Sequence, residues 1–327
     1  MQNSNFSLYQ KNNKLTPLKR ISLLLLLTLF AIVIFMTINV TGNLSYILWR
    51  RSWIVLTMLL VAFAVSLATV LFQTITNNRL LTPSIMGFES LFILLQTLLV
   101  FFGDQFHTYW FVRIGKFVIE TSLLIVFTLF LYRILFKKVR YNINLILIAG
   151  VILGTLFRSG ASLLQRLLDP NEFAVLQSRL FATFTRATPE LILFSLLIVL
   201  VIGAVLWLKR HQFDVLALGR DHAISLGINY CQLITVSLCL ISILVAISTA
   251  LVGPLTFLGL MVSNIAYLLT GSSKHKYLLP TTFLLASIAL IAGQLILEYG
   301  LNMASSLSVV LELTGGIFFI YLILKRF

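Results

Sequence analysis

One polar segment, 209–229, interrupts a chain that is otherwise almost entirely apolar, and its residue types suit recognition of a soluble partner. It reads KRHQFDVLALGRDHAISLGIN and contains two short apolar patterns with charged ends and two glycines. Short helices of this kind dock into grooves on soluble proteins; a helix lying in the lipid headgroup layer is the alternative. The residues that we expect to make the contact are Phe213, Asp214, Leu216, Leu218, Gly219, Arg220, Asp221, Ala223 and Gly227.

Ionisable side chains within apolar stretches are the second place to look for chemistry, because they are costly at membrane depth. Glu89 and Glu312 are the two such residues that we single out. Each carboxylate either is hydrogen-bonded to a neighbouring helix or faces water, or it lines a transport pathway. The two cysteines lack metal-ligand spacing. No G-x-x-x-x-G-K-[ST] phosphate loop is present, so the chain cannot bind ATP by that motif. The histidines, which a proton relay would need within the membrane, fall in connecting segments: His107, His211, His222 and His275.

The elements that must position these residues are transmembrane helices. The 327 residues are 59% hydrophobic and 10% charged, with a mean hydropathy of +1.03, which is typical of a polytopic membrane protein. We expect a polar N-terminal tail at 1–17 and a single transmembrane domain at 18–327. Apolar stretches long enough to cross a ~30 Å hydrocarbon core predict an all-α protein with ten transmembrane helices, at 18–38, 52–72, 85–103, 117–136, 143–160, 189–208, 230–252, 256–270, 278–298 and 307–324.

Basic residues indicate the orientation of these helices. With a cytoplasmic N-terminus, sixteen Lys and Arg residues fall on the inner side and eight on the outer side, which predicts that both termini are cytoplasmic. The net charge of +14 is largely this topological signal. Arginines near the outer ends of spans also suit docking of an acidic protein, with lipid anchoring as the alternative. Those that we single out are Arg50, Arg51, Arg158 and Arg166.

Proline and capping signals mark where several helices begin. Asp169 and Glu172, on either side of a proline, form a capping-box pattern that predicts a short surface helix at 173–181. By the same logic the sixth span begins at Pro189 and the third at Pro83.

The polar segment resembles a known family. Its run LALGRDHAISLGI, at 216–228, is similar to the coupling segment in the permease subunits of type II ABC importers, the family that carries ferric siderophores, haem and cobalamin. The run at 76–89 resembles the subgroup that serves ferric catecholate-type siderophores. Further stretches resemble motifs of the family in the same order along nearly the whole chain, at 72–73, 78–87, 149–154 (AGVILG), 250–260 (ALVGPLTFLGL), 278–280 (LLP) and 315–319 (GGIFF).

The chain departs from the family pattern at three places. Arg51 matches the first arginine of the family's R-x-P-R motif, but Trp53 and Ile54 replace the Pro-Arg that follows. Arg79 stands where the family usually has proline, and a serine-rich stretch at 305–308 replaces its Leu-Pro-x-Gly. The resemblance assigns the outer arginines to docking of the binding protein, so we expect that contact to be partly rebuilt here through neighbouring Arg50.

The resemblance implies a transport subunit that has no cofactor and no enzymatic activity, in the bacterial cytoplasmic membrane. Two permease subunits, identical or different, would enclose a central path. Two ATPase subunits would grip the coupling segments, and an extracytoplasmic binding protein would deliver a ferric siderophore. Leu216, Leu218 and Ala223 are then expected in a groove of the ATPase. The pathway or gate candidates are Glu89, Gly150, Gly154 and Glu312.

Three other functions are compatible with parts of this pattern. The first is a permease of the same architecture that imports haem or cobalamin. Only a transport or binding assay with the cognate binding protein would distinguish it from a siderophore permease. An ion-driven secondary transporter predicts membrane-buried carboxylates that are essential for uptake, and no ATPase partner. A membrane enzyme is disfavoured by the missing catalytic groups.

Overall fold

The structure is a computed structural model that describes residues 16–39, 42–102, 115, 117–126, 129, 143–301 and 305–326. All regular structure within these residues is helical. The helices are α2 (Pro17–Thr37), α3 (Leu44–Thr76), the 3-10 turn η1 (Pro83–Met86), α4 (Phe88–Phe102), an unlabelled helix (Phe117–Val126), α6 (Ile143–Gln165), α7 (Pro170–Leu180), α8 (Pro189–Leu208), α9 (Arg210–Leu216), α10 (Arg220–Ser225), α11 (Tyr230–Val252), α12 (Thr256–Thr270), α13 (His275–Leu295), the π-helical turn η2 (Ile296–Gly300) and α14 (Leu307–Arg326).

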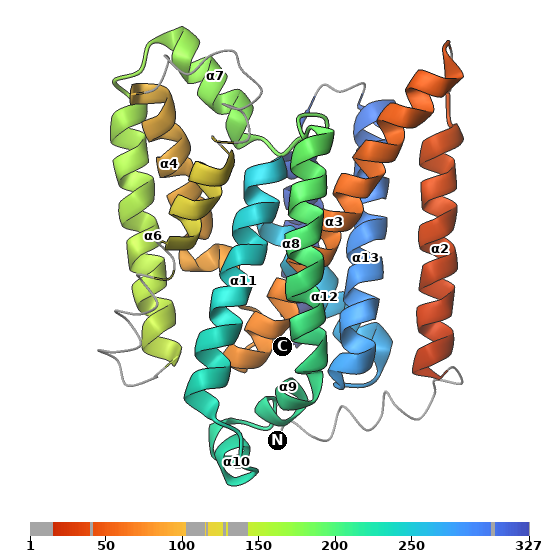
Figure 1. The fold of residues 1–327 in the computed structure, drawn as a ribbon, viewed down its shortest axis with the longest axis vertical. Coiled ribbons are helices and arrows are strands. Elements are labelled where there is room, and N and C mark those ends of the chain that lie inside the picture. The colour runs from red at the N-terminus through yellow and green to blue at the C-terminus, as the bar shows by residue number, and fades with distance from the viewer. Residues whose placement is uncertain are drawn as a thin grey trace.

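The described helices follow the ten predicted spans in order, and the predicted all-α polytopic architecture is confirmed. Six of them, α2, α3, α6, α8, α11 and α13, are long and apolar enough to cross a membrane. Four shorter apolar helices occupy the remaining positions. The largest difference is α3, whose 33 residues extend beyond the predicted span at both ends. At 1.5 Å per residue α3 is about 50 Å long, so it must tilt in the bilayer, and it runs obliquely in Figure 1.

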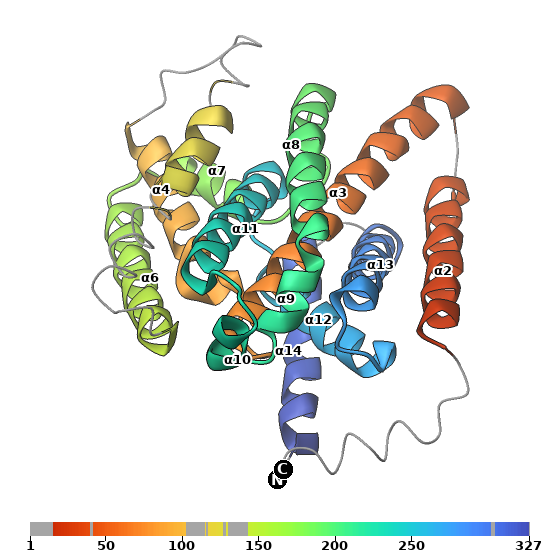
Figure 2. The same cartoon turned by 60° about the horizontal axis from the view of Figure 1, so that its bottom comes forward.

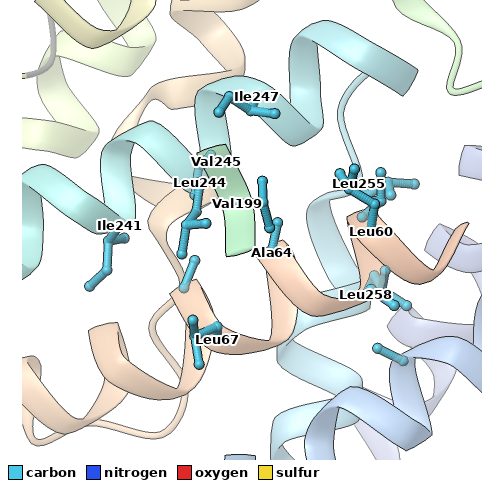
Figure 3. Packing of buried hydrophobic residues seen from close by; sticks show 14 of the residues in the cluster. Leu60, Ala64, Leu67, Val199, Ile241, Leu244, Val245, Ile247, Leu255 and Leu258 are labelled. Carbon is cyan, nitrogen blue, oxygen red and sulfur yellow. The ribbon is translucent and has the colours of Figure 1, made fainter. Parts of the chain in front are cut away.

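The centre of the bundle is α3, which lies among α8, α11, α12 and α13 (Figures 1 and 2). Its most apolar stretch is 78% buried, against 11% for peripheral α2. Helices in lipid associate mainly through close packing, which favours small residues at the contacts. Gly203 of α8 shows this, because a Cβ there would lie 2.5 Å from Cε1 of Phe63. Figure 3 shows the packing of α3 against α8 and α11 through Leu60, Ala64, Leu67, Val199, Ile241 and Leu244.

The local signals at helix starts are confirmed with one exception. Helix α7 begins with the expected capping box, in which the backbone N–H of Asp169 donates to Glu172 Oε2 at 3.4 Å, and α8 begins at Pro189. The exception is Pro83, which starts only the turn η1. Gly87 then adopts a φ of +91° and redirects the chain, so that α4 begins one residue later.

Candidate functional site

The segment 209–229 folds into the two short helices α9 and α10, at the end of the molecule opposite α7 (Figure 1). Gly219 and Gly227 follow these helices with φ of +102° and +81°, values that side chains disfavour. No atom lies within 4 Å of the Cβ that either position would carry. The backbone angle, rather than lack of space, therefore requires glycine at both turns.

The inner face of this loop packs against the chain's own transmembrane helices. Phe213, Leu216 and Ala223 are 0%, 3% and 0% exposed, and α9 contacts both α3 and α13. The prediction that Leu216 and Ala223 lie in a groove of the ATPase is therefore wrong. An apolar pattern indicates that a side chain is buried without indicating which chain buries it, and here these residues fasten the loop to the bundle.

The outer face of the loop exposes a different apolar set. Leu218, Ile224 and Leu226 are 59%, 50% and 62% exposed, and we name these three residues the coupling patch. Arg220 and Asp221 are also exposed beside it. Exposed apolar side chains with charged neighbours are typical of a protein-binding surface.

Asp214 belongs to a hydrogen-bonded anchor that the sequence did not reveal. Its Oδ1 accepts from the backbone N–H of His275 at 2.7 Å and lies 2.7 Å from His275 Nδ1. The other ring nitrogen, Nε2, lies 2.8 Å from Thr74 Oγ1 on α3. An ionised carboxylate only accepts hydrogen bonds, so Nδ1 carries a proton. The carboxylate thus faces inward instead of toward a partner, which corrects the prediction for Asp214.

The anchor also stabilises the start of α13. His275 is the first residue of that helix and is only 1% exposed, so its backbone N–H would otherwise be an unpaired donor. Burial raises the pKa of the Asp214 carboxyl, but the hydrogen bonds from His275 outweigh this and hold the pKa below its ordinary value. A negative charge at the N-terminus of α13 is favourable to the helix dipole.

Arg51 has an internal role in place of the predicted docking role. Its NH1 group donates to the carbonyls of Phe35, Met36 and Ile38 at 2.9, 3.1 and 2.8 Å, and NH2 donates to the hydroxyl of Tyr299 at 2.8 Å. The guanidinium thus caps the C-terminal end of α2 and ties it to η2. This corrects the prediction for Arg51, because both terminal nitrogens of its guanidinium already donate within the chain. Arg50 is exposed, and its docking role stays a prediction.

The structure brings the two candidate pathway acids together. The hydroxyl of Thr256, at the start of α12, donates to Oε1 of Glu312 on α14 at 3.5 Å, and both residues lie close enough to Glu89 on α4 to interact with its carboxyl group. Glu89 is only 9% exposed, and among the described residues its Oε1 has no hydrogen-bond partner. The sequence did not indicate that α4, α12 and α14 lie close together at these two residues.

The two candidate pathway glycines lie where α6 crosses the segment before α4. A Cβ on Gly87 would lie 2.9 Å from the Cα of Gly154 and 3.1 Å from the carbonyl oxygen of Gly150. Both positions on α6 are buried. These glycines therefore permit close helix packing, and their part in a pathway remains a prediction.

Comparison with known proteins identifies the family. The family model described as the FecCD transport family matches residues 18–325. The chain belongs to the FecCD transport family. It is 42% identical over 307 residues to the petrobactin import system permease protein YclO of Bacillus subtilis, covering 94% of this chain and 97% of YclO. It is 34% identical to the permease protein FatC of Bacillus anthracis, a petrobactin import system protein, over 85% of this chain and 78% of FatC.

Two further similarities are more distant. A second Bacillus subtilis petrobactin import permease, YclN, is 22% identical over 285 residues, covering 83% of each chain. The fold matches a solved metal-chelate type ABC transporter in an inward-facing conformation with a TM-score of 0.80 and 24% identity, over 95% of this chain and 100% of that one. The family membership confirms the prediction of an ABC importer permease, a transport subunit that depends on a separate ATPase and on a substrate-binding partner.

Proposed function

We propose that this chain is one of two permease subunits that import a ferric siderophore of the catecholate class across the bacterial cytoplasmic membrane, with both termini and the segment 209–229 in the cytoplasm. Its similarity to petrobactin permeases over 94% of its length supports this cargo class. The basic residue distribution supports the orientation. The polar tail at 1–17 belongs to the cytoplasmic side of a single permease domain.

The exposed coupling patch carries the ATP-driven part of the proposal. Leu218, Ile224 and Leu226 are presented on a loop whose inner face is locked to the bundle. Such a surface suits a groove on an ATPase, with Arg220 and Asp221 at the rim of the groove. Two copies of the ATPase would serve the two permeases. ATP can drive transport only if ATPase contacts with the patch favour one access state over the other.

The second permease subunit in this proposal is a different chain. Bacillus subtilis has two petrobactin import permease proteins, YclO and YclN, and this chain is 42% identical to the first and 22% identical to the second. A chain that resembles one member of a pair this unequally suits one side of a heterodimer. We place an extracytoplasmic binding protein, docked in part through Arg50, on the outer face.

Uptake of labelled iron tests the function. The chain would be expressed with its ATPase, second permease and binding protein in cells that lack siderophore permeases, and supplied with ferric catecholate, haem or cobalamin. Ferric catecholate uptake that requires the ATPase and persists when the proton gradient is collapsed supports the proposal. Uptake of haem or cobalamin alone, or uptake without the ATPase, contradicts it. The Leu218→Glu variant, inserted normally, serves as the uncoupled control.

A further inference from the structure

Four positively charged side chains gather where α9 meets the start of α13. Two follow the end of α8 and two flank His275, and we name the four residues the basic rim: Lys209, Arg210, Lys274 and Lys276. Helix α9 contacts both α8 and α13, and the lower ends of these two helices lie beside it in Figure 1. Asp214 lies one turn after Arg210 but already accepts hydrogen bonds from His275. None of the four cations has an ion-pair partner among the described residues.

The basic rim lies at the depth of lipid headgroups. Helix α8 has 20 residues, so it is about 30 Å long, which matches the thickness of the hydrocarbon core of a bilayer. Lys209 and Arg210 come directly after its last residue. The start of α13 is at the same depth, because His275 is bonded to Asp214 of α9. All four cations can therefore reach headgroup phosphates without entering the hydrocarbon.

The surface next to the basic rim suits acyl chains. Along α8, exposed apolar residues recur at helical spacing and share one face: Leu193, Leu197, Leu200, Val201 and Leu208. At the inner end of α8, Trp207 is partly exposed, and Cζ of Arg210 lies 5.2 Å from the centre of its ring. Nζ of Lys276 lies 5.7 Å from the centre of the Tyr277 ring. Tryptophan and tyrosine are enriched where hydrocarbon meets headgroups, so these rings hold two of the cations at that boundary.

From this arrangement we infer that the basic rim binds the headgroup of an anionic phospholipid, which fastens α9 to α13 from the membrane side. Arg210 makes one hydrogen bond among the described residues, from Nη1 to the carbonyl of Trp207 at 3.1 Å, and its Nε has no partner. Most of its five donors are therefore free, and a guanidinium pairs well with phosphate oxygens. The inference rests on the cytoplasmic placement of 209–229 in the proposed function, because anionic lipids of the cytoplasmic leaflet attract such basic segments.

The position of the basic rim separates the lipid from the proposed ATPase contact. The coupling patch begins at Leu218, after the end of α9, whereas Lys209 and Arg210 stand at its start and adjoin the exposed apolar face of α8. Lipid and ATPase would therefore hold opposite ends of the same short helix. The chain itself supplies the contacts between them, through buried Phe213 and the Asp214 anchor. Removing the lipid should loosen α9 and leave the coupling patch in place.

The test uses the complete transporter, with second permease and ATPase, in nanodiscs of phosphatidylcholine with or without phosphatidylglycerol. Native mass spectrometry counts the lipids retained on release from the disc, and hydrogen–deuterium exchange reports on the amides of α9. The wild type should retain phosphatidylglycerol in preference to phosphatidylcholine, and its α9 should exchange more slowly when phosphatidylglycerol is present. High salt should weaken both effects.

The variants remove charges from the basic rim. Arg210→Gln and Lys274→Gln should each weaken retention of phosphatidylglycerol about fivefold, and the double variant about 25-fold, the order of magnitude expected for basic residues near an anionic surface. Arg210→Lys keeps the charge and should retain most of the binding. The matched control is Arg179→Gln on α7, at the opposite end of the molecule (Figure 1), which should leave the exchange of α9 unchanged.

Three results would overturn the inference. In the first, the wild type retains both lipids equally. In the second, the double variant retains phosphatidylglycerol like the wild type but loses its ATPase, so that the basic rim contacts protein. In the third, inorganic phosphate protects α9 in phosphatidylcholine discs as well as phosphatidylglycerol does, so that a free anion occupies the site. The proposed function fails separately: no ferric catecholate uptake by the wild type contradicts the cargo, and labelling of Lys209→Cys only from outside the cell contradicts the orientation.

Discussion

Replacing Asp214 with alanine tests whether α9 is held to the bundle through His275. The carboxylate accepts two hydrogen bonds, both at 2.7 Å, from the backbone and the ring of that residue. Hydrogen bonds to a charged group contribute about 1.5–3 kcal/mol each. Because Asp214 is 25% exposed, the lower value applies, and the variant should lose about 3 kcal/mol of loop anchoring.

Hydrogen–deuterium exchange of the amides in α9 measures this loss directly. Local opening populations rise tenfold for each 1.4 kcal/mol, so the amides of α9 should exchange about 100-fold faster in Asp214→Ala than in the wild type. Asp214→Asn keeps an acceptor of the same shape without the charge and should show a smaller increase, of about tenfold. Asp221→Ala removes an exposed carboxylate from the neighbouring helix and is the matched control.

The reasoning fails if α9 exchanges at the same rate in the wild type and in Asp214→Ala. It also fails if Asp221→Ala has the larger effect, because the loop would then be held by its exposed charges. A readout of coupling accompanies the exchange data: Asp214→Ala should retain its ATPase on purification, since the coupling patch is intact, while uptake per ATP hydrolysed falls.

Four further predictions follow from the same contacts. Leu218→Glu with Leu226→Glu should abolish ATPase co-purification while thermal unfolding in detergent stays unchanged, because both side chains are exposed; unchanged co-purification would refute the assignment of the patch. Gly87→Ala should lower the free energy of unfolding by about 1–3 kcal/mol, measured by thermal melting, because its φ is +91° and its Cβ position is occupied. Arg51→Lys should destabilise the protein by about 2 kcal/mol without weakening binding-protein affinity. The folded-state pKa of Asp214 is depressed, so its contribution to the stability of the loop should be complete above about pH 3.9, the ordinary aspartate pKa. That contribution should be lost as the pH falls through the lower folded-state pKa. If the amides of α9 lost their protection from exchange near neutral pH in the wild type alone, this prediction would be contradicted.

Local sequence signals accounted for the helices and turns. These signals act over short stretches of chain, so they can be recognised in a single sequence. Examples are the length of an apolar run, the Asp169 capping box, and the glycines at 219 and 227. Pro83 shows the limit of such signals. A proline allows a helix to start, but the contact of Gly87 with α6 decides where α4 begins, and that contact joins distant segments.

Side-chain partners could not be predicted in the same way. Asp214 and His275 are 61 residues apart, and Arg51 and Tyr299 are 248 residues apart. From the sequence, the charged side chains of Asp214 and Arg51 were expected at the surface, because a charged group is usually exposed unless a partner is present. The sequence also did not show which apolar residues of the loop are buried within the chain. The structure shows that Ala223 is buried and Leu218 is exposed.

The anchor connects the loop that carries the coupling patch to α13 and α3. Displacing α9 without α13 would break both hydrogen bonds of Asp214, and displacing it without α3 would break the contact of His275 with Thr74. Beside Thr74, the side chain of Gln73 donates to Ser263 on α12 at 2.9 Å. Because α3 is central and also packs against α8 and α11, we expect a push on the loop to displace these core helices together. If the proposed ATPase contact is correct, we expect the loop to move with the bundle, so that an ATPase that binds the patch differently in two states would shift the access equilibrium.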